Sequence, residues 1–133
     1  MLFRSEVAEA LNEDESYYST YGWHPRSVEA ALATLDYIEK NEEFLRTNIR
    51  EMGNYLVEQI SMLAFESEPT IRSKGLAIGV SFDDEGYGSK IVDRAKSKGL
   101  LLSEGENGFC LFPALTIDRK TADEAVDILG ACT

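Results

Sequence analysis

Two stripes of apolar residues with helical spacing dominate the first half of the chain. The first begins after Pro25, which suits the first turn of a helix, and the second follows Lys40. In each stripe the apolar positions recur every three or four residues: Val28, Ala31, Leu32, Leu35 and Ile38, then Leu45, Ile49, Met52, Leu56, Ile60 and Leu63. This spacing predicts one helix over about 25–40 and a second over about 42–64.

Between Leu76 and Phe82 the pattern changes to a strict alternation. Large apolar residues alternate there with Ala77, Gly79 and Ser81. A period of two predicts a strand whose large residues all lie on one face. The opposite face carries only small side chains, so another backbone or a helix can approach it closely.

The last third of the chain predicts two further helices and a hairpin. One helix ends at Gly99, because glycine readily takes the left-handed conformation at a helix end. Two short strands, Leu100–Leu102 and Phe109–Phe112, suit a hairpin with a longer loop, and a cap at Asp118 or Thr121 begins the last helix. The element order predicts an α+β fold. It is a small antiparallel or mixed sheet of three to four short strands with helices packed on one face, preceded by a long two-segment helix.

Residues 1–24 differ in character from the rest of the chain. They show little periodicity, and four of the seven residues from Tyr17 to Trp23 are aromatic. Such a segment suits a short helix and loop that lie against another surface. We therefore expect residues 1–24 to be poorly ordered alone and residues 25–133 to form the stable core.

The composition fits a single acidic domain. The 133 residues include 24 acidic and 13 basic residues, for a net charge of −11, and 44% are hydrophobic, which is enough for a core. The negative charge argues against nucleic acid and against a membrane surface as partners. No apolar run suits a membrane helix or a signal peptide, so we expect a cytoplasmic protein.

Few residues offer catalytic or metal-binding chemistry. His24 is the single histidine, so a His-based zinc site or a Ser-His-Asp triad is hard to build, and we expect His24 to lie in a turn or cap. Cys110 and Cys132 have no thiol or histidine nearby, and we expect both to be reduced and structural. The six lysines lie in polar stretches, without the apolar surroundings that favour a Schiff base.

The segment Ser19–Gly22, just before the helix at Pro25, is the one stretch that suits an anion. It combines hydroxyl groups, a glycine backbone and a nearby helix N-terminus, and a phosphate can use all three. The same pattern is typical of an ordinary helix cap. The residues alone leave both interpretations open.

Three stretches, in the right order, resemble the C-terminal part of the class-III pyridoxal-phosphate aminotransferases, the ornithine, acetylornithine and 4-aminobutyrate type. Ser19–Pro25, followed by an alanine-rich helix, is similar to the motif S-T-[FY]-G-G-N-P. Ile71–Gly79 is similar to V-R-G-x-G-L-x-x-[AG]. Leu100–Ile117 resembles the G-L-L hairpin that closes in R-[LF]-x-P-P-L-x-I. The resemblance covers essentially the whole chain.

The resemblance implies the small C-terminal domain of a homodimeric enzyme. The parent would transfer an amino group between an amino acid or amine and a 2-oxo acid, with pyridoxal phosphate as cofactor. Thr20 matches a threonine that contacts the phosphate of the cofactor bound by the other subunit, and it is the one site residue carried over. The Schiff-base lysine and the aspartate that pairs the pyridine nitrogen precede the matching region. The chain therefore carries no catalytic residue and no metal ligand, and we expect it to self-associate, to form no internal aldimine and to be inactive alone.

Departures from the family pattern keep other functions open. Trp23 and His24 stand where Gly-Asn is usual, and Ala114 replaces a second proline. Cys110 stands where many members have an arginine associated with substrate carboxylate recognition or with an active-site glutamate, and a cysteine supplies no cation. One alternative is a non-catalytic interaction or ligand-binding module with the same fold. Another is a parent of the related aminomutase or decarboxylase kind, since one fold hosts several reactions.

Overall fold

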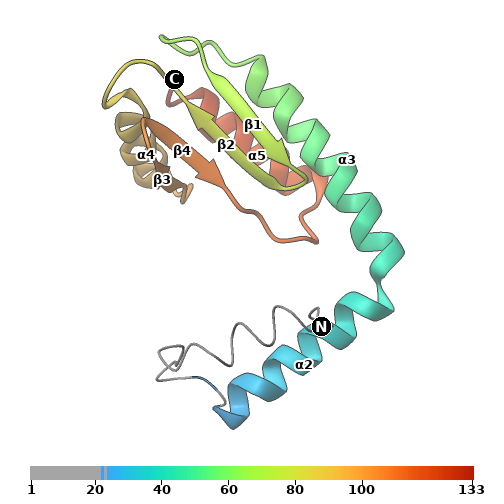
Figure 1. Cartoon of the computed structure of the whole chain (residues 1–133). Coiled ribbons are helices and arrows are strands. Elements are labelled where there is room, and N and C mark those ends of the chain that lie inside the picture. Colours follow the sequence, from blue (N-terminus) through green and yellow to red (C-terminus); the bar gives the residue numbers. More distant parts are fainter. Residues whose placement is uncertain (1–21, 23) are drawn as a thin grey trace, which may run out of the picture. The chain divides into compact units, whose positions relative to one another are not determined.

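The computed structural model describes Gly22 and residues 24–133 (Figure 1). Helix α2 belongs to one compact unit, and everything from Asn41 onward belongs to a second, so each is described by itself. The elements are α2 (Pro25–Lys40), α3 (Glu42–Ser61), β1 (Thr70–Lys74), β2 (Ala77–Ser81), α4 (Tyr87–Ser97), β3 (Ser103–Gly105), β4 (Gly108–Leu111) and α5 (Arg119–Gly130).

The two stripes form the two predicted helices. The bounds of α2 coincide with the prediction, whereas α3 ends at Ser61, earlier than predicted. At Asn41 the backbone leaves helical geometry, with φ −118° and ψ 21°, so one residue separates the two helices. The Asn41 carbonyl still accepts a hydrogen bond from the Leu45 amide at 2.9 Å, which starts α3.

The unit from Asn41 onward is built around a four-stranded sheet in which all neighbouring strands are antiparallel. The order is β1-β2-β4-β3. Helix α4 connects β2 to β3, and β4 lies between these two strands in the sheet. The predicted α+β class and strand number are therefore confirmed. Strand β1 was missing from the predicted element order, because its sequence TIRSK is mostly exposed and shows no apolar alternation.

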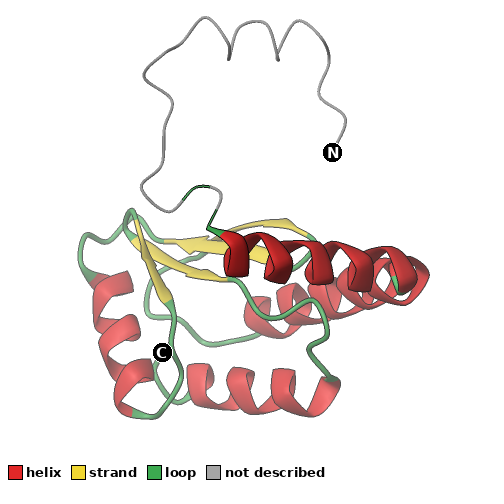
Figure 2. Ribbon diagram, turned by 90° about the horizontal axis from the view of Figure 1, so that it is seen from below, coloured by secondary structure: helices red, strands yellow, loops and turns green. Residues whose placement is uncertain are grey.

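The core lies on one face of the sheet, beneath helices α3, α4 and α5 (Figure 2). The large residues that flank and form β2 all point into it, as their alternation predicts: Leu76, Ile78, Val80 and Phe82. Phe109 of β4 pairs with Val80 and is 1% exposed. All three helices pack on this face. The prediction that the helices lie on one face of the sheet is therefore confirmed for the unit from Asn41 onward.

The hairpin differs from its prediction. The strand before the turn is Ser103–Gly105, and Leu100–Leu102 form no strand. The reason is local: Gly99 takes the left-handed conformation with φ 92°, and the Leu100 amide donates to the Ala95 carbonyl at 2.9 Å. This closes the C-terminal cap of α4 and removes Leu100 from any ladder.

Two glycines allow close backbone contacts around β4: Gly88 lets α4 lie directly on this strand, and Gly108 lets the strand approach β2. A Cβ added to Gly88 would lie 2.4 Å from the Gly108 Cα, and one added to Gly108 would lie 1.9 Å from the Val80 carbonyl oxygen. Both distances are shorter than any real contact, so a larger residue at Gly88 would push α4 off the sheet, and one at Gly108 would push β4 away from β2. Among the helices that the structure describes, none is long and apolar enough to cross a membrane.

Candidate functional site

The face of the sheet opposite the core carries a groove of about 410 Å³. We call it the open-face groove. The residues that matter for its chemistry are Arg72, Gly79, Asp83, Gly105, Glu106 and Cys110. The alternation in β2 explains the bottom of this groove. Because successive side chains of a strand point to opposite faces, the residues between the core positions of β2 face the groove.

The strand register puts an arginine and a cysteine in one row across the groove. Arg72 of β1 pairs with Gly79 of β2, and Gly79 pairs with Cys110 of β4. Gly79 has no side chain, and a Cβ built there would find only the Cys110 Sγ at 3.8 Å and the Arg72 carbonyl oxygen at 4.0 Å. The space above the middle of the row is therefore open.

Arg72 is the one cation among the described residues that line the groove. Within residues 24–133 the ion pairs join Arg46 to Glu42 and Arg119 to Asp123, and Arg72 takes part in neither. A guanidinium presents a planar set of donors that matches a carboxylate. The open-face groove can therefore bind an anionic group at the Arg72 end.

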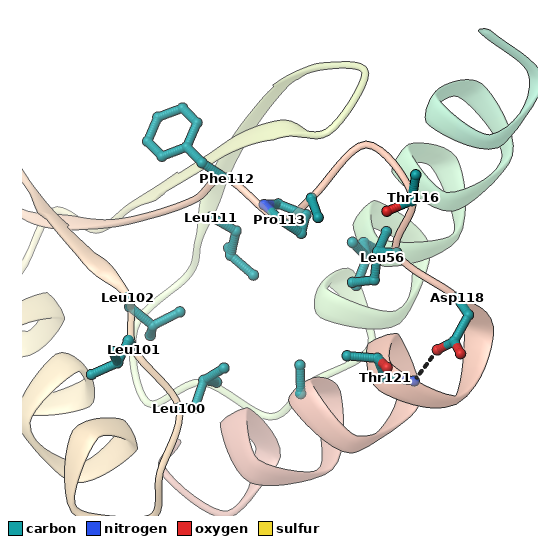
Figure 3. A pocket seen from close by; sticks show the side chains of 13 residues that line it. Leu56, Leu100, Leu101, Leu102, Leu111, Phe112, Pro113, Thr116, Asp118 and Thr121 are labelled. Carbon is teal, nitrogen blue, oxygen red and sulfur yellow. Dashed lines mark hydrogen bonds between the residues drawn. The ribbon is translucent and has the colours of Figure 1, made fainter. Parts of the chain in front are cut away.

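A second, mostly apolar hollow of about 480 Å³ lies beside the segments that precede β3 and follow β4 (Figure 3). It opens where Leu100–Leu102 and the chain after β4 diverge, with Leu56 of α3 on the far wall. The carboxylate here belongs to Asp118, and it accepts a hydrogen bond from the Thr121 amide at 2.8 Å. Asp118 is thus the predicted cap of α5, and no histidine, cysteine, lysine or second carboxylate is among the described residues that line the hollow.

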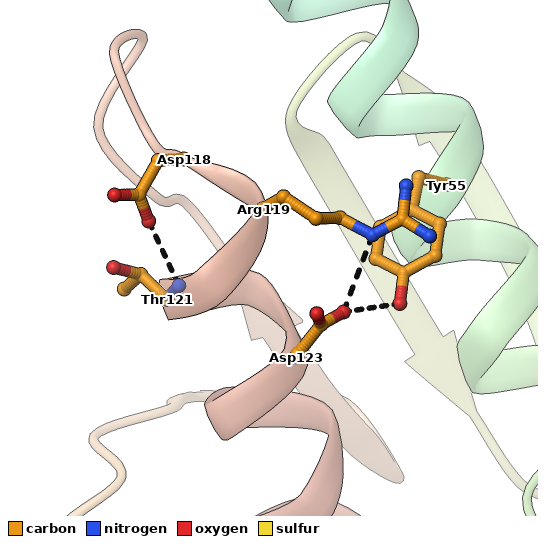
Figure 4. A network of polar contacts seen from close by, with 5 residues as sticks. All are labelled: Tyr55, Asp118, Arg119, Thr121 and Asp123. Carbon is orange, nitrogen blue, oxygen red and sulfur yellow. Dashed lines mark hydrogen bonds and ion pairs between the residues drawn. The ribbon is translucent and has the colours of Figure 1, made fainter.

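A polar cluster joins α3 to α5 (Figure 4). The Tyr55 hydroxyl donates to the Asp123 carboxylate, the Arg119 Nε lies 3.3 Å from the same carboxylate, and the Arg119 guanidinium carbon lies 3.2 Å from the centre of the Tyr55 ring. The hydrogen bond to Asp123 raises the pKa of Tyr55 above its ordinary value of 10.0. The phenol therefore stays protonated at neutral pH, and the side-chain contacts of the cluster hold α3 and α5 together.

Within the residues that it describes, the structure does not bring the candidate residues from the sequence analysis together in one site. Thr20 and the rest of Ser19–Tyr21 lie outside the described residues. The His24 carbonyl accepts a hydrogen bond from the Val28 amide at 3.0 Å, which starts α2 and agrees with the predicted cap. Both cysteines are free: Cys132 is buried, whereas Cys110 is half-buried on the open face.

The described residues do not fit a covalently bound aldehyde cofactor. All six lysines of the sequence fall within residues 24–133, and each is exposed. An amine in water stays protonated and is a poor nucleophile, whereas a Schiff-base lysine needs burial or a nearby cation to lose its proton. No group of acidic, histidine and cysteine residues in the described part of the chain could hold a metal ion.

Sequence reasoning did not place Arg72 in a site. Its residue type and motif were visible, but its neighbours across the sheet were not, because β1 lacked a strand pattern. The alternation in β2 was the usable signal: it predicted a face with small side chains, on which an arginine from an adjacent strand has room.

The α+β architecture is that of a domain found in transaminases. The model of the family "Aminotransferase class-III" matches residues 1–133, so the chain belongs to that family. The chain is 34% identical over 127 residues to the acetylornithine aminotransferase of Archaeoglobus fulgidus, covering 95% of the chain and 31% of the relative. It is 35% identical over 112 residues to the acetylornithine aminotransferase of Methanosarcina mazei, covering 84% and 27%.

Solved structures agree with the family assignment. An amine transaminase from an uncultivated Pseudomonas species, in its PLP-bound internal aldimine form, superposes with a TM-score of 0.71 at 30% identity over 99% of this chain and 34% of that one. An aminotransferase of Bacillus anthracis gives a TM-score of 0.74 at 25% identity, over 97% and 33%. The chain thus spans about a third of the length of these relatives.

Proposed function

We propose that the chain is the small C-terminal domain of a pyridoxal-phosphate-dependent aminotransferase and is inactive alone. The parent transfers an amino group between an amino acid or amine and a 2-oxo acid, as a cytoplasmic homodimer. The observation that carries the proposal is the match of the whole chain to a third of transaminases of known fold. The exposure of all six lysines supports the proposal that the chain is inactive alone, since a chain without a buried amine offers no place for an internal aldimine.

In this proposal Thr20 contacts the cofactor from the neighbouring subunit. Its hydroxyl donates to the phosphate near the N-terminus of α2, where neutral donors and the helix dipole favour an anion. A hydrogen bond to a charged acceptor contributes about 1.5–3 kcal/mol, which corresponds to roughly tenfold to a hundredfold in cofactor affinity.

A domain exchange tests the proposal. The chain replaces the matching third of the Archaeoglobus fulgidus acetylornithine aminotransferase, and the chimera is assayed for amino transfer beside the isolated chain. We expect turnover from the chimera only. In a chimera that stays dimeric, Thr20→Val should raise the dissociation constant of the cofactor at least about tenfold.

Three results would contradict the proposal. The first is an isolated chain that turns over substrate, or that yields one stoichiometrically modified lysine after pyridoxal phosphate and borohydride. The second is a folded, dimeric chimera without activity, which favours a non-catalytic binding module. The third is a Thr20→Val chimera with unchanged cofactor affinity, which returns Thr20 to the role of a turn cap.

A further inference from the structure

We propose that Arg72 is the specificity-determining residue of this domain, because its guanidinium holds the carboxylate of the substrate in the open-face groove. The inference deepens the proposed function and rests on it for the identity of the ligand as an amino acid or 2-oxo acid. The binding event itself depends only on the groove, so it can be measured on the chain without cofactor.

Arg72, which would bind the carboxylate, lies two strands away from Cys110 in the sheet. Neighbouring strands lie about 4.8 Å apart, so the Cα atoms of Arg72 and Cys110 are separated by roughly 10 Å. The Arg72 side chain can extend over Gly79 toward the middle of the groove, because Gly79 places nothing in its way. Cys110 occupies the other end of this row, and a cysteine side chain supplies no positive charge to a carboxylate.

The charge of Arg72 is available to a ligand. The chain carries 24 acidic residues against 13 basic ones, and yet no carboxylate of the described residues pairs with Arg72. The carboxylates that do line the groove, Asp83 and Glu106, lie at its far end, where β2 ends and β4 begins. Asp83 follows Gly79 by four residues, which is about 13 Å along an extended strand.

This separation of charges predicts which carboxylates bind best. A carboxylate at Arg72 gains a charge-assisted, bidentate contact. A second carboxylate that reaches toward Asp83 and Glu106 is repelled, whereas an ammonium group there is attracted. We therefore expect the order 5-aminopentanoate, then pentanoate, then glutarate, from tightest to weakest.

The test is a titration of the isotopically labelled whole chain with each of these three probes, followed by NMR. We expect saturable shifts at Gly79 and Cys110 and at the Arg72 Nε, with dissociation constants in the millimolar range. Arg72→Gln should weaken the binding of 5-aminopentanoate at least about tenfold, as expected for the loss of contacts to a charged group.

Two further variants separate a built site from general attraction. Gly79→Val keeps the cation but fills the groove, and it should abolish the shifts, since Gly79 has free space and its backbone φ is not positive. Lys74→Gln is the matched control: Lys74 is an exposed cation on the same strand and face as Arg72 and pairs with Ala77 outside the groove. It should leave binding unchanged. Retained amide spectra verify that each variant folds.

Equal loss in Lys74→Gln and Arg72→Gln would overturn the inference, because it indicates attraction to net charge alone. Absence of saturable shifts at Gly79 and Cys110 would overturn it as well. Failure here and failure of the proposed function are distinguishable: an active chimera with a groove that binds nothing refutes only the role of Arg72. A groove that binds in a folded but inactive chimera refutes only the transaminase proposal. In an active chimera, Arg72→Gln should reduce kcat/KM more for an amino acid donor than for an amine without a carboxylate.

Discussion

The helix-covered face of the sheet and its open face are built from alternate residues of the same strands. On the covered face the side chains of Ile78, Val80 and Phe109 are almost completely buried beneath three helices. On the open face β2 presents small residues, and Arg72 of the neighbouring strand β1, which takes part in no ion pair among the described residues, lines the groove. Stability and chemistry are therefore divided between the two faces: the covered face is fixed by packing within the chain, and the open face is accessible to a ligand.

The strongest test of this division uses two adjacent residues of β4. Phe109→Ala removes a ring that is 1% exposed and should lower the free energy of unfolding by about 3–5 kcal/mol, through lost burial and a residual cavity. Cys110→Ser changes a half-buried residue on the open face and should cost less than about 1 kcal/mol. Urea unfolding followed by circular dichroism measures both. Similar losses for the two variants would show that the open face also contributes to the core.

Glycines on the two faces give a second, smaller contrast. In Gly88→Ala the new Cβ would lie 2.4 Å from the backbone of Gly108, so α4 must move off the sheet, at a cost of about 1–3 kcal/mol. In Gly79→Ala the nearest atom is the Cys110 Sγ at 3.8 Å, and stability should change by no more than about 0.5 kcal/mol. The same unfolding measurement compares them. A Gly79→Ala loss as large as that of Gly88→Ala would mean that the groove is closed in solution.

The same contrast explains how far the sequence could predict the fold. Periodicity reports what a residue must do locally, so it predicted the helix bounds of α2 and the buried face of β2. It could not distinguish α2 from α3: both carry an apolar stripe, but α3 buries five residues, whereas α2 buries none. Burial depends on what lies opposite a stripe, and the stripe itself does not contain that information.

The errors in the hairpin and the site have a related cause. Leu100–Leu102 has the composition of a strand, but the amide of Leu100 is already used by the cap of α4. Arg72 became a candidate only once its pairing with Gly79 and Cys110 was known. Such pairing joins residues distant in sequence, and local propensity does not specify it. The role of Thr20 stays a prediction, since it lies outside the described residues.

The smallest expected effect concerns pH, and it sharpens the contrast between packing and exposed charge. No charged residue is buried among those that the structure describes, so the covered face itself should be insensitive to pH. One of the helices that cover it, α5, is capped by the exposed side chain of Asp118, and the hydrogen bond from the Thr121 amide lowers the pKa of Asp118 below its ordinary value of 3.8. A depressed pKa in the folded state means that this cap contributes its full stability above pH 3.8 and loses it as the pH falls through the lower, folded-state pKa.

Asp118→Asn isolates this effect, because asparagine also caps helices well but does not titrate. We expect the urea midpoint of the unchanged chain to fall more between pH 7 and acidic pH than that of Asp118→Asn, so that the two midpoints converge on acidification. Asp118→Ala, which removes the cap at every pH, should have a lower midpoint than either at neutral pH. If the urea midpoints of the unchanged chain and of Asp118→Asn fall equally with pH, this account is contradicted. The acid sensitivity of the domain would then arise from other carboxylates.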